Sequence, residues 1–125
     1  MKLCIDSMHP RVPGEIEATD IDQVEQLIRR LDQDRYTIVS LGEPDRPLLM
    51  VCGGKGDYVV TATPDGKTWS GLAMGPRDGA SKRINGGGQP AEFPSHEVAT
   101  LDQALAAARY FFQHGALDPS LTWET

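Results

Sequence analysis

Between residues 36 and 74 the chain reverses direction three times, each time within a few residues. β-branched and aliphatic runs at 36–41, 48–52, 58–63 and 68–74 are separated by short segments rich in Gly, Pro and Asp. Connections this short join antiparallel strands, because a parallel pair needs a crossover of a dozen or more residues. The pattern predicts an antiparallel meander.

Two helices are predicted, one on each side of the meander in the sequence. Residues 20–32 begin with an Asp20 cap and Gln23 three residues later, and the second helix begins with Thr100 and Gln103 in the same spacing. Gly115 is the expected end of the second helix. Apolar residues recur at helical spacing in both: Ile21, Val24, Leu27, Ile28 and Leu31, then Leu101, Ala104, Leu105, Ala108, Phe111 and Phe112.

We therefore expect an α+β fold, with an antiparallel sheet of about five or six strands and two helices packed on one face. Residues 2–6 are a possible first strand, and residues 7–18 are expected to be a loop or irregular arm. A further strand is expected near 82–85 and an edge segment at 91–93. The 125 residues contain no repeat or linker, so residues 1–125 are predicted to form one domain. Trp123 is expected to fold back, mostly buried near Phe111 or Phe112.

Charge and composition exclude several classes of partner. The chain has 18 Asp and Glu against 12 Lys and Arg, a net charge of -6, which disfavours nucleic acid and anionic lipid. The apolar run at 48–52 is too short to cross a bilayer, and the first residues do not resemble a signal peptide. We expect a cytoplasmic protein in which Cys4 and Cys52, each inside an apolar run, are buried thiols.

No motif predicts catalysis. The histidines and cysteines lack metal-ligand spacing, Ser70 is not in a nucleophile elbow, and Gly53–Gly56 lacks the spacing and the Lys-Ser/Thr of a phosphate loop. We expect no metal, no cofactor and no enzymatic activity, and instead a protein that acts by binding. The alternative is a small ligand-binding domain or enzyme whose site is built from loops.

The loops between strands supply the candidate partner contacts. Loops on a rigid scaffold often carry recognition, and carboxylates there suit a basic partner. The candidates are Asp45, Asp57, Asp65, Trp69 and Asp78. Each aspartate is also a typical turn residue, and Trp69 is equally suited to core packing. A docking face on the N-terminal arm and first helix, around Glu15, Glu17 and Glu25, is the competing location.

The C-terminal third carries a family resemblance. A Gly-rich turn precedes Pro90-Ala91-Glu92-Phe93-Pro94, and Val98 leads into an Ala-rich helix that ends Ala108-Arg109-Tyr110-Phe111-Phe112-Gln113-His114-Gly115 before Pro119 and Trp123-Glu124. This order resembles family one (Imm-one) of the immunity proteins of bacterial polymorphic toxin systems. The specific part of the resemblance covers about residues 84–125.

The resemblance implies a small cytoplasmic α+β protein that binds and neutralises a cognate toxin domain. Toxins partnered with this family are often nucleic-acid deaminases, which carry a zinc site with H-x-E and C-x-x-C motifs. This chain has neither motif, as expected of the inhibitor. A toxin that acts on nucleic acid needs a basic groove, so a partner with a basic surface is expected. Phe111, Phe112, Gly115, Pro119 and Trp123 match the family pattern as structural residues.

Overall fold

The structure, a computed structural model, describes all 125 residues. Its elements in chain order are β1 (Lys2–Ile5), β2 (Glu15–Glu17), α1 (Ile21–Arg30), β3 (Ile38–Gly42), β4 (Leu48–Gly54), β5 (Asp57–Thr63), β6 (Ser70–Leu72), β7 (Lys82–Gly86), β8 (Gln89–Phe93), the short 3-10 helix η1 (Ser95–Glu97), α2 (Leu101–His114) and β9 (Trp123–Glu124).

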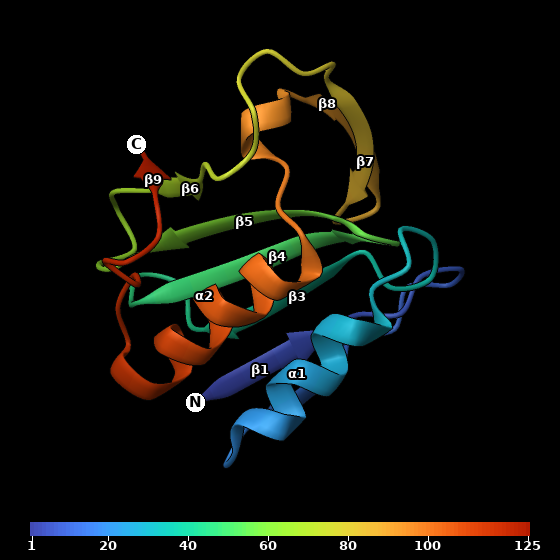
Figure 1. The fold of residues 1–125 in the computed structure, drawn as a ribbon. Helices are drawn as coiled ribbons and strands as arrows, with labels where there is room; N and C mark the ends of the chain where they lie inside the picture. Colours follow the sequence, from blue (N-terminus) through green and yellow to red (C-terminus); the bar gives the residue numbers. More distant parts are fainter.

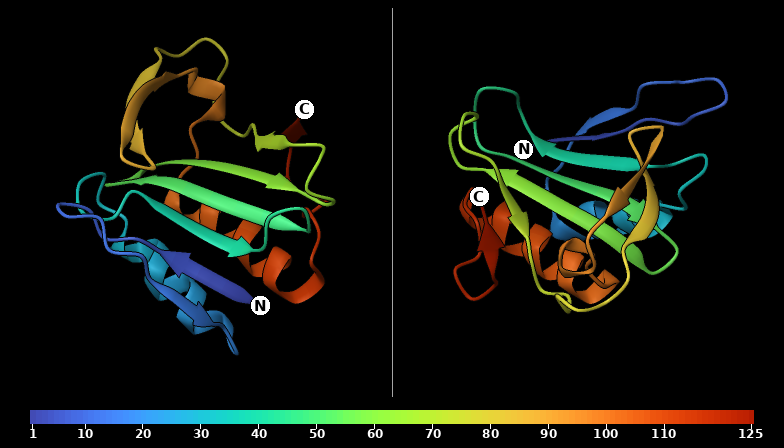
Figure 2. Two further views of the ribbon diagram at one scale, coloured as in Figure 1. Left: turned by 180° about the vertical axis from the view of Figure 1, so that it is seen from behind. Right: turned by 90° about the horizontal axis from the view of Figure 1, so that it is seen from above.

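Seven strands form one antiparallel sheet in the order β2-β1-β3-β4-β5-β6-β9. Strands β3 to β6 are the predicted meander. Both helices lie on one face of this sheet (Figure 1), and the view from behind shows that no helix covers the opposite face (Figure 2). The predicted α+β class, with two helices on one face of an antiparallel sheet, is confirmed.

The sheet contains more strands than the five or six expected. Strand β2 lies within the stretch expected to be a loop or arm, and all three of its residues are exposed, so it lacks the alternation that marks a half-buried strand. Strand β9 comes from the tail and is only two residues long. Strands β7 and β8 pair with each other instead of joining the sheet.

The helices begin and end as their sequences predict. Asp20 and Thr100 each accept a hydrogen bond from the backbone N–H three residues later, and the Gln23 and Gln103 side chains complete the two capping boxes. Gly115 ends α2 with a φ of 65°, in the left-handed region that suits glycine. The main core lies between these helices and the sheet, with Val24, Ile28, Leu105 and Phe111 buried against Leu41, Leu49, Val51 and Val60.

The β7–β8 hairpin packs on the opposite face of the sheet. Buried Ile84 lies outside the main core cluster, and Gly86 lies directly against Cys52 of β4. Gln33 holds this hairpin in place: its Oε1 accepts from the Asn85 backbone N–H at 3.0 Å, and its backbone carbonyl accepts from Asn85 Nδ2 at 3.0 Å. The hairpin therefore depends on contacts with a loop about fifty residues away in the sequence.

The C-terminal tail folds back onto the sheet, as predicted. Strand β9 pairs with β6, and Trp123 Nε1 donates to the Asp118 carbonyl at 2.9 Å. The Trp123 side chain packs against the main core but is half-buried, less than expected.

Both cysteines are free and half-buried, so the expectation of two buried thiols is wrong in degree. They occupy strand positions that face away from the helices, where cover is incomplete. Removal from water nevertheless raises the pKa of Cys52 to about 11 and also raises the pKa of Cys4. Both thiols are therefore protonated and weakly nucleophilic at neutral pH. Neither helix has the length and hydropathy needed to cross a membrane.

Candidate partner-binding surface

The five candidate contact residues lie in three separate places. The β3–β4 and β5–β6 turns lie at one end of the sheet and carry Asp45 and Asp65, because the strand register aligns Gly42, Leu48 and Thr63 there. The β4–β5 turn lies at the other end, where Gly54 pairs with Asp57. Asp78 is exposed in the loop between β6 and β7. The loops thus do not form the single edge that the sequence suggested.

Asp45 and Asp65 lie on turns that are in direct backbone contact. A Cβ added at Gly66 would lie only 2.5 Å from Asp45 Cα, so the two turns can pack this closely only with glycine there. Gly66 also has a φ of 80°, and Asp45 a φ of 62°. Two exposed carboxylates from turns distant in sequence are therefore on neighbouring backbone segments.

The Asp65 carboxylate organises its own turn. Its Oδ1 accepts from the backbone N–H groups of Lys67 at 2.7 Å and Thr68 at 2.9 Å. Donation from Thr68 and Lys67 lowers the pKa of Asp65 below its usual value, so the group is ionised at neutral pH. Asp65 thus acts as a turn residue, one of the two roles that the sequence suggested for it. Its second carboxylate oxygen is still available to a partner.

Trp69 lies on the surface rather than in the core. It immediately precedes β6, follows the Asp65 turn, and its exposed fraction of 38% places it among the most exposed large apolar residues. An exposed tryptophan beside acidic turns is the kind of side chain that anchors protein interfaces. The end of the sheet that holds Asp45, Asp65 and Trp69 therefore combines charge with an aromatic group.

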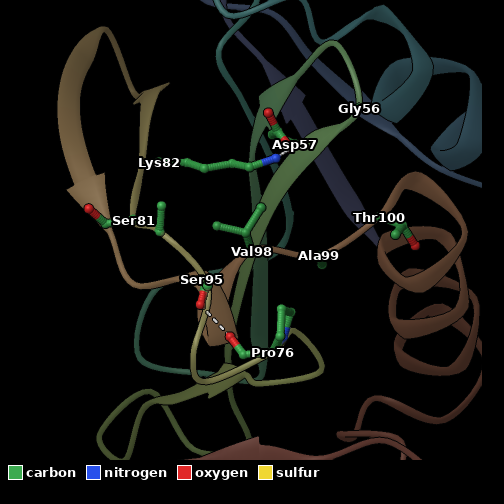
Figure 3. Close-up of a pocket in the computed structure, with 11 residues that line it drawn as sticks. Gly56, Asp57, Pro76, Ser81, Lys82, Ser95, Val98, Ala99 and Thr100 are labelled. Atoms are coloured by element: carbon green, nitrogen blue, oxygen red, sulfur yellow. Dashed lines mark hydrogen bonds and ion pairs between the residues drawn. The ribbon is translucent and has the colours of Figure 1, made fainter.

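Asp57 is already engaged within the protein. Its carboxylate accepts from Lys82 Nζ of β7 at 2.9 Å, which ties the hairpin to the start of β5. This ion pair borders a cavity of about 460 Å³ between the hairpin, η1 and the beginning of α2 (Figure 3). Figure 3 shows Lys82 reaching toward Asp57, with Ser95 turned to the Pro76 carbonyl, to which its hydroxyl donates.

The cavity is lined mainly by small side chains, with a few polar groups. Gly56, Gly79, Ala80 and Ala99 leave the space open, and Ser81 and Thr100 add hydroxyls. The sequence pattern identified Thr100 only as a helix cap and did not indicate the cavity, because its walls come from three separate segments, within 56–57, 76–82 and 95–100. No three His, Cys, Asp or Glu side chains gather closely enough to hold a metal ion.

Comparison with known proteins identifies the family. The model of the family described as Immunity protein Imm1 matches residues 13–125. The chain belongs to this immunity protein family. A search of curated proteins finds no match. The match extends well beyond the C-terminal third that carried the resemblance, and includes β2, both helices and the whole meander.

Proposed function

We propose that this protein is an immunity protein that binds a cognate bacterial toxin domain and neutralises it by occupying its surface, without catalysis. The observation that carries this proposal is the family match over residues 13–125. The toxin acts in the cytoplasm in this proposal, and the immunity protein meets it there.

We further propose that the partner presents a basic surface, as a nucleic-acid deaminase would. The support is electrostatic: the chain has a net charge of -6, and its field favours encounter with a cationic protein. Asp45, Asp65 and Trp69 are the first candidate contacts because they lie at one end of the sheet. Asp57 and Asp78 are candidates on the hairpin side.

Co-expression tests the proposal directly. The toxin domain encoded beside this gene is expressed in a sensitive bacterium with and without this protein, and the purified toxin is tested for binding and for deaminase activity on single-stranded nucleic acid. We expect growth to be restored and a stable complex to form. Toxicity that persists with abundant folded protein contradicts the immunity function. A neutralised toxin without deaminase activity contradicts only the proposed chemistry.

The cavity beside Lys82 favours the second candidate function, a small ligand-binding domain. Its volume of about 460 Å³ lies within the usual range of small-molecule sites. A thermal-shift screen of metabolites separates the two proposals. A ligand that raises the melting temperature of the wild type, but not of a variant that narrows the cavity at an exposed lining residue, Ala80→Leu, supports ligand binding. A screen without such a ligand favours the toxin partner.

A further inference from the structure

The face of the sheet opposite the helices carries one row of residues that crosses all seven strands. Residues paired across antiparallel strands point to the same face. The register aligns, from β2 to β9, Glu15, Cys4, Ser40, Met50, Thr61, Gly71 and Glu124. The adjacent positions Leu3, Leu41 and Leu49 are buried under the helices, so this row points away from the helices. It therefore lies on the face that neither α-helix covers (Figure 2). We call these seven residues the open-face row.

The centre of the open-face row is uncharged and its ends are charged. Cys4, Ser40, Met50 and Thr61 are half-buried, with neutral Ile38 and Leu48 beside them on β3 and β4. In a sheet with one face toward solvent, the outward side chains are normally polar. Charged residues make up 24% of this chain. Within the row the acids lie only at the two ends, where Glu15 pairs with Lys2 at 3.6 Å and Glu124 pairs with Arg77. A centre depleted of charge inside a charged rim is the anatomy of a protein interface.

The shape of the face suits a protein partner. The β7–β8 hairpin covers only one side of it, where Gly88 meets Met8 of the N-terminal arm. A hollow of about 190 Å³ opens beside Cys4, Ser40 and Met50, and the Asp6–Arg11 ion pair also lines it. The surface beside Gly71 is also open, because a Cβ placed there would meet no atom within 4 Å. The row thus offers a central Met50, a flexible side chain that adapts to a partner, between two open areas.

We propose that the cognate toxin docks on the open-face row, placing an uncharged patch over Met50 and basic side chains that share the carboxylates of Glu15 and Glu124 with Lys2 and Arg77. This inference rests on the proposed function and specifies its docking face. The charged groups around the row indicate which kind of partner can bind there. The row contains no cation, and the cations around it are held by carboxylates of the same chain. Lys2 pairs with Glu15 at 3.6 Å and with Glu43 at 3.2 Å, Arg11 with Asp6 at 2.8 Å, and Arg77 with Glu124. Phosphate or anionic lipid would find no unpaired cation there, whereas a protein with lysines or arginines around a neutral patch can cover the centre and share the carboxylates at the rim.

Three single variants, compared by titration calorimetry with the wild-type chain and the purified toxin domain, test the docking face. Met50→Lys puts a charge at the centre of the row. Gly71→Gln adds a neutral side chain where the backbone and the surrounding space accept one. Gln26→Lys adds the same charge as the first variant on the exposed surface of α1 and is the matched control. Melting temperatures show that each variant is folded.

We expect Met50→Lys to weaken toxin affinity at least about 30-fold, the loss that a central interface residue produces. Gly71→Gln should weaken binding with an unchanged melting temperature, and Gln26→Lys should bind like the wild type. The proposal is overturned if both row variants bind the toxin like the wild type, whatever Gln26→Lys does. It is also overturned if the wild type alone is a dimer that Met50→Lys dissociates, because a second copy then covers the row. A wild type that binds no toxin overturns the proposed function itself.

Discussion

At the scale of single residues, the candidate aspartates differ in what their carboxylates already do. Asp65 accepts hydrogen bonds from its own turn, and Asp57 pairs with Lys82. Asp45 and Asp78 form no ion pair within the chain. Replacing Asp45 or Asp78 with Asn therefore tests partner contact alone. At Asp65 and Asp57, Asn is also preferable to Ala, because it keeps an acceptor oxygen while it removes the charge.

Asp32 is expected to make stability depend on pH. Its Oδ1 accepts from the backbone N–H groups of Tyr36 and Asp34, both at 3.0 Å, and donation from Tyr36 is the main reason that its pKa is lowered. A lowered pKa in the folded state gives stability that is complete above the unfolded value of about 3.9 and is lost as the pH falls through the folded value.

We expect Asp32→Ala to lower the free energy of unfolding at pH 7 by about 1–2 kcal/mol, from two lost hydrogen bonds. Asp32→Asn should lose less, because the amide oxygen still accepts. Urea titrations between pH 7 and 2 measure both variants against the wild type. The stability difference between the wild type and Asp32→Asn should narrow below pH 4; a constant difference would show that the charge of Asp32 contributes nothing.

Trp123 is the residue that attaches the tail. We expect Trp123→Ala to lower the free energy of unfolding by about 2–3 kcal/mol. This is toward the lower end of values for large buried side chains, because Trp123 is only half-buried, and it includes the lost hydrogen bond to the Asp118 carbonyl. Trp123→Phe should recover most of the apolar contact and is the control. Chemical denaturation of both variants measures the effect, and an unchanged midpoint for Trp123→Ala would mean that the tail adds no stability.

At the scale of elements, the β7–β8 hairpin is attached by few contacts. It pairs with no strand of the main sheet. It is held by Ile84, by the Lys82–Asp57 ion pair, by Gln33 and by the Thr37 hydroxyl, which accepts from the Gly88 N–H at 3.0 Å. Gln33 also donates to the Gly54 carbonyl at 2.9 Å, which links the hairpin to the end of β4. Local opening of an element held this way should require less free energy than opening of the sheet.

We expect Gln33→Ala to release the hairpin without unfolding the sheet. Amide hydrogen exchange at residues 82–93 should accelerate roughly tenfold or more, since the lost hydrogen bonds contribute about 1–1.5 kcal/mol each. Exchange in β4 and β5 should change little. Gln113→Ala, an exposed position near the end of α2, is the control. Equal acceleration in the hairpin and the sheet would show instead that they open together.

At the scale of the whole molecule, the net charge of -6 should govern how fast the toxin is captured. Steering by opposite charges weakens as salt rises, since the screening length is only about 10 Å in 0.1 M salt. We expect the association rate constant to fall between about 20 and 500 mM NaCl, roughly tenfold, with a smaller change in the dissociation rate. Stopped-flow mixing with the toxin domain measures both.

A double variant that combines Asp45→Asn with Asp65→Asn provides the comparison for this salt dependence. It removes two charges from neighbouring turns, while the amide oxygen that replaces the Asp65 carboxylate still accepts hydrogen bonds from its turn. A shallower salt dependence than that of the wild type is expected. If the wild-type rate is already independent of salt, shape and apolar contact control association, and the basic-partner proposal is wrong.

A large aromatic residue near the terminus, Trp123, was enough to predict the return of the tail to the sheet. Local patterns in the sequence predicted the meander and both helices with their caps. Each depends on residues a few positions apart: helical spacing, a Thr or Asp with Gln three residues later, or a turn of Gly, Pro and Asp. The C-terminal motif was also sufficient to indicate the family, which the match over residues 13–125 then established.

Long-range pairing produced the features that these patterns did not contain. Glu15 and Ile16 became part of a strand only because β1 lies beside them. The turns that carry Asp45 and Asp65 touch, at Asp45 and Gly66, only because both turns end on the same side of the sheet. The open-face row joins residues from seven strands whose order is not their order in the chain. A shift of one residue in any pairing would turn that strand's contribution to the opposite face, so the composition of the row follows from register rather than from any local signal.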